Sequence, residues 1–228
     1  QRQMCIRDRP IRLVRSELFG EKLFVPADAE IVIEGFVPKD IYEVEGPFSE
    51  YPGTYSPQTI NPIIEVKKVY MRRDAIIYDI APGLADHQLI GALAIEALLY
   101  RTLKQSFPQV VNVHVPLSGS GRFHAYIQVR KDRPGLGIDV GLAALSAYWS
   151  IKHVFVVDED VDIFNDSEVL WAVATRLHKD GIVIVPDPKF TYKAVFDCTK
   201  PVSQRGISLS PIRIKPPDDL LEKWLSKI

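Results

Sequence analysis

The chain is organised around one segment, Glu45-Gly46-Pro47-Phe48-Ser49-Glu50-Tyr51-Pro52-Gly53-Thr54-Tyr55. Glu45 and Glu50 stand five positions apart, between a Gly-Pro and a Pro-Gly pair, so a regular helix cannot carry them. We expect a rigid loop packed by its three aromatic side chains. A carboxylate among aromatic rings is poorly solvated, which disfavours its charged form and suits it to hold and deliver a proton. A surface turn with two solvated glutamates is the simpler interpretation, and spacing alone favours it.

Further segments follow a fixed order around this loop. Upstream lies Val25-Pro26-Ala27-Asp28-Ala29-Glu30-Ile31-Val32-Ile33-Glu34-Gly35. Downstream, Lys152 precedes the run Val156-Val157-Asp158-Glu159-Asp160-Val161-Asp162, and Glu168-Val169-Leu170-Trp171-Ala172-Val173-Ala174-Thr175-Arg176 comes next. From about Ile11 onward, the chain resembles the UbiD family of decarboxylases in all four segments.

The resemblance implies a cofactor and two catalytic residues. UbiD enzymes use prenylated FMN as an electron sink while an unsaturated carboxylic acid loses carbon dioxide, and an acid then protonates the remaining carbon. By position, Glu50 matches that acid and Glu45 matches its partner in a Glu-Arg-Glu network. Lys152 matches a lysine that reaches the flavin phosphate. Ser49 departs from the motif, in which glycine is usual, and Tyr51-Pro52-Gly53-Thr54-Tyr55 departs from the Gly-Tyr-Tyr-like stretch of many members. Because this loop borders the substrate in the family, the second departure places the identity of the substrate in question more than the type of reaction.

Several parts of the family's site fall outside the resemblance. The network arginine and most ligands of the divalent metal (Mn or Mg) and of potassium belong to segments that come before the matched region in the family. No metal ligand is therefore assigned in this chain, and Glu17, the nearest carboxylate, receives no role. We expect a fragment that is inactive alone. Arg176 is either near the family's cation site or an ordinary ion-paired helix arginine.

Composition describes a globular chain without a nucleic-acid signature. The chain has 228 residues, 46% of them hydrophobic, and a formal net charge of -1. No basic excess is available for nucleic acid or an anionic membrane. The chain has only two cysteines, Cys5 and Cys198, and their spacing is not that of a zinc site. So few cysteines are typical of a protein from a reducing compartment. We expect a cytoplasmic protein with a small carboxylic acid as substrate, no membrane span and no secretory signal.

The pattern predicts an α+β or α/β protein in three parts. Residues 1–9 match nothing in the family and are interpreted as a non-native leader. Residues 10–82 contain β-type runs, Glu30 to Val37, Pro62 to Met71 and Ala75 to Ile80, with a turn at Arg73-Asp74. By resemblance, they form the C-terminal part of a flavin-reductase-like split β-barrel.

Residues 83–228 alternate helical and strand patterns, which predicts an α/β domain. Asp86 is expected to cap a helix to about Ser106, with Leu89, Ile90, Leu93, Ala97 and Leu98 on one face. Strands are predicted at 110–115, 123–129, 153–158 and 182–185, and helices at 134–149 and from Asn165 or Asp166 to Leu177. Residues 186–217 are interpreted as an extended excursion. Asp218 to Ile228 is predicted to be an amphipathic helix that docks on its own domain or on a partner.

Two alternatives to a decarboxylase stay open. The C-terminal domain could be a non-catalytic oligomerisation module, a use that UbiD relatives also make of it, so a homo-oligomer is expected in either case. The acidic run Asp158, Glu159, Asp160 and Asp162 could instead bind the metal of a transferase, although capping and solvated charges explain it adequately. His124 is interpreted as a sheet residue rather than as a base.

Overall fold

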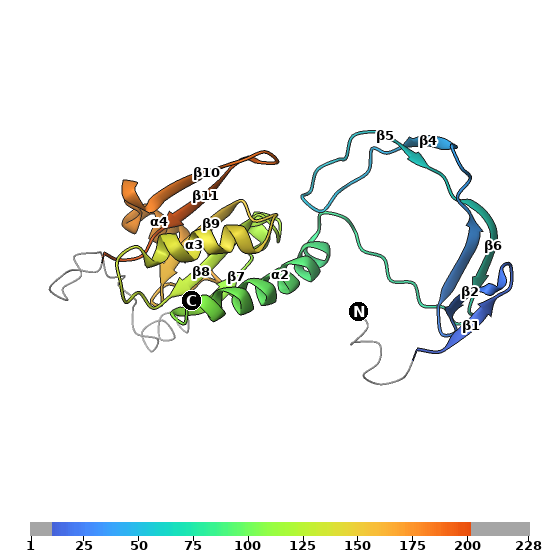
Figure 1. Cartoon of the computed structure of the whole chain (residues 1–228), viewed down its shortest axis with the longest axis horizontal. Coiled ribbons are helices and arrows are strands. Elements are labelled where there is room, and N and C mark those ends of the chain that lie inside the picture. Colours follow the sequence, from blue (N-terminus) through green and yellow to red (C-terminus); the bar gives the residue numbers. More distant parts are fainter. Residues whose placement is uncertain (1–10, 202–228) are drawn as a thin grey trace, which may run out of the picture. The chain divides into compact units, whose positions relative to one another are not determined.

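The computed structural model describes residues 11–201, and these divide into two compact units, residues 11–82 and 83–201 (Figure 1). Each unit is described by itself. The predicted leader at 1–9 and the predicted terminal helix at 218–228 lie outside the described residues. Both therefore stay predictions.

The second unit is built on a five-stranded mixed sheet with the order β10-β11-β9-β8-β7. Its strands are β7 (Val110–His114), β8 (His124–Val129), β9 (His153–Asp158), β10 (Ile182–Asp187) and β11 (Thr191–Asp197). Strands β8, β9 and β11 run parallel to one another, whereas β7 and β10 pair antiparallel at the two edges. A mixed α/β architecture was predicted from the alternating patterns, and it is confirmed.

Two hydrophobic clusters lie on opposite faces of this sheet. Along β8, Ala125, Ile127 and Val129 belong to one cluster, and Tyr126 belongs to the other. Because side chains alternate across a strand, the two clusters occupy opposite faces. Helices α2 (Ala85–Ser106) and α3 (Leu136–Ala147) cover the first face, and α4 (Asp166–Arg176) packs on the second.

The apolar face that the sequence indicated for α2 is not the face that the helix buries. Leu89, Ile90 and Leu93 are 46%, 57% and 56% exposed, whereas the helix buries a neighbouring stripe. This stripe consists of Ala92, Ile95, Leu99 and Leu103. The helix is apolar on two sides, and its hydrophobic pattern does not say which side meets the sheet. Asp86 is not its cap either, because Leu84 occupies that position without a side-chain hydrogen bond.

The interpretation of residues 186–217 as an excursion is also wrong in its first part. Residues 191–197 form β11, which lies between β9 and β10 inside the sheet. Lys193 is buried there, and its ammonium has two polar partners: it donates to the carbonyl of Trp149 (2.8 Å) and pairs with Asp187 (3.6 Å). A buried lysine with two polar partners gives this strand a hydrophilic appearance in the sequence.

The first unit consists of three separate antiparallel strand pairs. These are β1 (Leu13–Ser16) with β2 (Gly20–Pro26), β3 (Ile31–Phe36) with β6 (Glu65–Met71), and β4 (Tyr42–Glu45) with β5 (Thr59–Pro62). Within residues 11–82 the strands close no barrel. The turn at Arg73-Asp74 forms, but no strand follows at 75–80. Ile76 and Ile77 remain exposed, and the Ile76 amide donates to the Glu30 carboxylate instead of to a strand.

This unit has almost no core of its own. Its buried residues are two polar ones, Ser16 and Glu34, and no hydrophobic side chain between residues 11 and 82 is buried. Apolar side chains instead stand exposed along its strands, for example Ile33, Val44, Ile60 and Val69. Hydrophobic burial is the dominant favourable term in folding, so these exposed side chains contribute little of that stabilisation within residues 11–82.

Candidate active site

The Glu45–Tyr55 segment forms a closed loop between β4 and β5. Glu45 is the last residue of β4 and pairs with Thr59, the first residue of β5. At the tip, the Glu50 amide donates to the carbonyl of Thr54 (2.8 Å) and the Gly53 amide donates back to the carbonyl of Glu50 (3.0 Å). Gly53 has a φ of 78°, a left-handed conformation that glycine adopts without strain. These bonds hold Glu50 at the start of a tight turn.

Polar side chains on the returning arm hold the two arms together. Ser56 donates from its hydroxyl to the Phe48 carbonyl (3.2 Å), and its amide donates to the same oxygen (2.9 Å). Gln58 donates to the Gly46 carbonyl (3.2 Å), and Asn61 donates to the Glu45 carboxylate. The sequence predicted a rigid loop from its glycines and prolines. It did not reveal that this arm supplies the cross-links, since a serine, a glutamine and an asparagine in sequence carry no motif.

The expected aromatic packing around the loop is wrong for two of its three rings. Phe48 is 44% exposed and Tyr55 is 78% exposed. Glu45 is exposed as well, whereas Glu50 is half-buried. Phe48 and Tyr55 are exposed because residues 11–82 contain no buried hydrophobic side chain on which they could pack. The catalytic roles of Glu45 and Glu50 therefore stay predictions.

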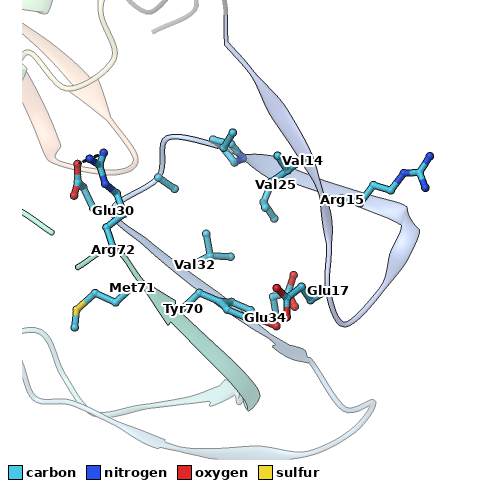
Figure 2. Close-up of a pocket in the computed structure, with 13 residues that line it drawn as sticks. Val14, Arg15, Glu17, Val25, Glu30, Val32, Glu34, Tyr70, Met71 and Arg72 are labelled. Carbon is cyan, nitrogen blue, oxygen red and sulfur yellow. Dashed lines mark hydrogen bonds and ion pairs between the residues drawn. The ribbon is translucent and has the colours of Figure 1, made fainter. Parts of the chain in front are cut away.

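The first unit also carries an open pocket of about 270 Å³ (Figure 2). Its apolar wall comes from Val14, Val25 and Val32, and charged side chains stand at its two ends. Neither Glu45 nor Glu50 lines it. The Val25–Gly35 segment, one of the four that carry the family resemblance, forms part of the pocket wall.

Glu30, at one end of the pocket, links strand β3 to the segment after β6. Its carboxylate pairs with Arg72 (3.4 Å) and accepts the Ile76 amide (3.1 Å), while its carbonyl accepts the Arg72 amide (3.0 Å). Figure 2 shows Glu30 and Arg72 side by side at this end. The pairing explains why a glutamate stands at this point of the motif: it tethers the chain where the predicted strand at 75–80 fails to form.

Glu34, at the other end, is 4% exposed and accepts the Leu18 amide (3.1 Å). It lies close to Glu17 and Tyr70 (Figure 2). Burial raises the pKa of Tyr70, an effect that Lys68 partly offsets, so the phenol stays neutral at physiological pH. In the sequence, Glu34 stood out only as part of the Val25–Gly35 segment. The signal that its side chain points inward was its position two residues after Val32, because alternate residues of a strand share a face.

Lys152 lies in the second unit, just before β9. Its ammonium stands 4.8 Å from the centre of the Tyr192 ring, and among residues 11–201 it forms no ion pair. A cation that is held by an aromatic face but lacks an anionic partner can receive a phosphate. The geometry is therefore compatible with the role that the resemblance implies.

The acidic run forms an ion-pair network rather than an open cluster. Arg176, whose side chain has no exposed surface, donates to both carboxylate oxygens of Asp160 (2.9 and 2.8 Å) and to Asp158 (3.2 Å). Lys200 pairs with Asp160 (2.7 Å), and its amide donates to Asp158 (2.8 Å). The Arg176 guanidinium holds the pKa of Asp160 well below its usual range, while burial raises the pKa of Asp158. This pairing accounts for the carboxylates and favours a structural role over the transferase alternative.

The histidines form polar pairs inside the second unit. His124 and His153 are neighbours on β8 and β9, and their ring nitrogens Nε2 and Nδ1 lie 3.2 Å apart. Burial, followed by the proximity of His124 and Lys152, lowers the pKa of His153 to about 4. His114 contacts Glu96 of α2 (2.6 Å). These contacts agree with the interpretation of His124 as a sheet residue.

No group of three or more metal-type side chains gathers anywhere between residues 11 and 201. In the same range, none of the helices has the length and apolar character needed to cross a membrane.

Comparison with known proteins identifies both units. Residues 4–85 match the family model described as the 3-octaprenyl-4-hydroxybenzoate carboxy-lyase Rift-related domain, and residues 88–198 match the C-terminal domain of the same enzyme. The anhydromevalonate phosphate decarboxylase of Methanothermobacter thermautotrophicus is 38% identical over 177 residues, which are 77% of this chain and 41% of that protein. The phenolic acid decarboxylase of Bacillus subtilis is 34% identical, over 87% of this chain and 45% of that protein.

Solved structures agree with these matches. The UbiD-class enzyme HmfF from Pelotomaculum thermopropionicum in complex with FMN superimposes with a TM-score of 0.80 at 38% identity, over 94% of this chain and 51% of that one. An evolved dimeric form of HmfF in complex with prFMN gives a TM-score of 0.78 at 39% identity, over 97% and 48%. The chain spans about half the length of the relatives it matches. With both of its units matched to UbiD domains, the chain belongs to the UbiD family.

Proposed function

We propose that this chain is the C-terminal portion of a UbiD-type decarboxylase that releases carbon dioxide from an aromatic or other unsaturated carboxylic acid. The observation that carries the proposal is the Glu45–Glu50 loop, a closed turn that presents two carboxylates inside a unit matched by the family model. Relatives at 34% and 38% identity are named as decarboxylases. The direction of the reaction in the cell is left open by this proposal.

Glu50 has the role of proton donor in this proposal. Its carboxyl group delivers a proton to the substrate carbon that loses carbon dioxide, and Glu45 has the role of its partner carboxylate. When bound, prenylated FMN supplies the electron sink for the charge that develops at that carbon. Lys152 would hold its phosphate, since the ammonium has no anionic partner among the described residues. The divalent metal (Mn or Mg) and potassium would take most ligands from the segment that comes before the matched region in the relatives.

The exposed apolar strands of residues 11–82 support a second part of the proposal, namely that these strands are the last portion of a split β-barrel. With no buried hydrophobic side chain, the unit lacks the free energy that burial supplies, and its strand pairs present unpaired edges. The remaining barrel strands, which the relatives carry in their other half, would cover these faces and complete the site. Residues 1–228 alone would then neither hold the flavin tightly nor turn over substrate.

The test is decarboxylation by a complete enzyme, in which this chain follows the segment that its relatives carry, produced with a supply of prenylated FMN. Carbon dioxide release from aromatic and other unsaturated acids should be lost in Glu50→Gln. The control is Glu43→Gln, which changes a neighbouring exposed glutamate on β4 and should retain activity. An enzyme that binds the flavin and keeps its activity in Glu50→Gln would overturn the assignment of the donor.

We also propose that the C-terminal unit forms a homo-oligomer, through the edge of β10 that pairs with no other strand among residues 11–201. The opposite edge strand, β7, carries a bulge and packs against α2. Strand β10 pairs in unbroken register with β11 and leaves Ile182 and Ile184 at 42% and 65% exposed. An open apolar edge of this kind pairs readily with a second copy. Native mass spectrometry of Ile184→Lys, with the exposed Leu170→Lys on α4 as control, should show loss of the oligomer only in the first.

The sparing use of cysteine is the ground for expecting a cytoplasmic location.

A further inference from the structure

Asn61 stands on the same face of the β4–β5 ribbon as the catalytic loop's first carboxylate. Glu43 pairs with Asn61 and Glu45 pairs with Thr59 across the two strands. Directly opposite residues share a face, and side chains two apart on a strand do as well, so these four polar side chains line one face together. Val44 and Ile60 occupy the other face and are 67% and 71% exposed.

The amide nitrogen of Asn61 donates two hydrogen bonds on this face. Its Nδ2 donates to Oε2 of Glu45 and to the Thr59 hydroxyl (3.1 Å), so both of its N–H groups have acceptors. Asn61 therefore bonds to its diagonal neighbour Glu45 rather than to Glu43 directly opposite. Among the described residues, Oε1 of Glu45 accepts no hydrogen bond.

We propose that Asn61 is a positioning residue for the Glu45–Glu50 pair: its amide, steadied by Thr59, holds one carboxylate oxygen of Glu45 and leaves the other oxygen available. Glu45 is exposed at a strand end, and without this bond its side chain would sample several rotamers. A carboxylate that must act beside Glu50 requires one orientation, which a second polar residue supplies. The inference rests on the proposed function for its catalytic consequence, but not for the contact itself.

The contact can be tested without any activity, in the complete protein. In its side-chain amide NMR spectra, Glu45→Gln should shift the Asn61 Nδ2 resonances, because the carboxylate that accepts their hydrogen bond becomes an amide. Glu43→Gln, which changes the residue directly opposite, should leave them in place. Resonances that respond to neither variant, or equally to both, would overturn the contact.

The positioning role is tested in the complete, flavin-containing enzyme by kcat and KM. Asn61→Leu should lower kcat by about 10- to 100-fold, with KM within about twofold, as expected for a misplaced catalytic group. Asn61→Gln keeps an amide donor and should recover part of the loss. Asn61→Asp keeps the shape of the side chain, but an ionised carboxylate can only accept hydrogen bonds. Its kcat should therefore be low at neutral pH and should rise as the introduced carboxyl group gains a proton and becomes a donor.

Three results separate the possible failures. Asn61 variants with the kcat of the wild type at every pH would overturn the positioning role. A loss in Asn61→Asp that does not recover at lower pH would overturn the donor argument. Full activity in Glu50→Gln would instead overturn the proposed function, and the NMR experiment would still decide whether Asn61 holds Glu45.

Discussion

Arg176 shows how one residue can organise the end of a sheet. Its guanidinium is fully buried, donates to both Asp158 and Asp160, and lies 4.8 Å from the centre of the Trp171 ring. Lys200 adds a second cation to Asp160, so the chain just after β11 is tied to the end of β9. Removing one partner of such a network leaves a charge buried without compensation, which costs far more than the network contributes.

We predict that Arg176→Gln lowers the free energy of unfolding by about 3 to 5 kcal/mol. Denaturant unfolding followed by tryptophan fluorescence measures this change, since Trp171 lies against the guanidinium. The matched control is Arg130→Gln, because Arg130 forms an exposed pair with Glu159 (3.0 Å). It should cost less than about 1 kcal/mol. Equal effects of the two substitutions would contradict the structural role of the buried network.

His153 makes the stability of the second unit dependent on pH. Its folded pKa is about 4, whereas the ordinary value is 6.5. Between these two pH values the unfolded chain therefore binds more protons than the folded chain. The contribution of neutral His153 to the free energy of unfolding is fully present above pH 6.5 and is lost as the pH falls toward 4. The pKa of His124 is lowered in the same direction by burial.

Melting temperatures at pH 7.5 and 5 should thus differ by less in His153→Gln than in the wild type. His178→Gln, at an exposed position, should retain the full difference. The prediction fails if the two variants show the same dependence on pH.

At the scale of elements, helix α3 packs unusually close to the sheet. Cβ atoms added at Gly137 and Gly141 would overlap the side chains of Asp197 and Val195 on β11. The two glycines lie four positions apart, one turn along the same face of the helix. They allow the helix axis to approach a strand that carries β-branched side chains.

Gly141→Ala should therefore destabilise the protein by about 1 to 3 kcal/mol, because overpacking exceeds the gain in helix propensity. Ser146→Ala, at an exposed position of the same helix, should stay within about 0.5 kcal/mol of the wild type. Chemical denaturation of both variants measures the difference. A Gly141→Ala variant as stable as the wild type would show that β11 can move away from the helix.

At the scale of the whole molecule, the two units differ in how much apolar surface they bury. The second unit holds all of the buried hydrophobic side chains among residues 11–201, and the first holds none. Local opening requires little free energy where few apolar contacts must break. The difference in burial therefore becomes a difference in backbone protection.

Hydrogen exchange by mass spectrometry should show amides of β3 and β6 exchanging much faster than those of β8 and β9 in the isolated chain. In a protein of the relatives' full length, exchange in β3 and β6 should be slower, and exchange in β8 and β9 nearly unchanged. Equal protection in the two units of the isolated chain would contradict the view that residues 11–82 need a covering segment.

Local patterns in the sequence predicted several elements well. Strand β9 has the predicted bounds, and α4 begins after Asn165, whose side chain accepts the Ser167 amide as a helix cap should. The segment from Glu45 to Tyr55 forms a loop closed by backbone hydrogen bonds, where its glycines and prolines excluded a regular helix. In each case the signal lies within a few residues of the element that it describes.

The sequence by itself thus determined the family, the alternation of helices and strands, and the loop that carries Glu45 and Glu50, because these depend on local backbone preferences and on motifs. Only the tertiary structure decided which side of α2 is buried, that β11 lies inside the sheet, and that Arg176 pairs with Asp158 and Asp160. It also showed that Asn61 reaches Glu45. These features depend on contacts between residues far apart in the chain, and an apolar or charged side chain does not record in its own neighbourhood which distant partner it will meet.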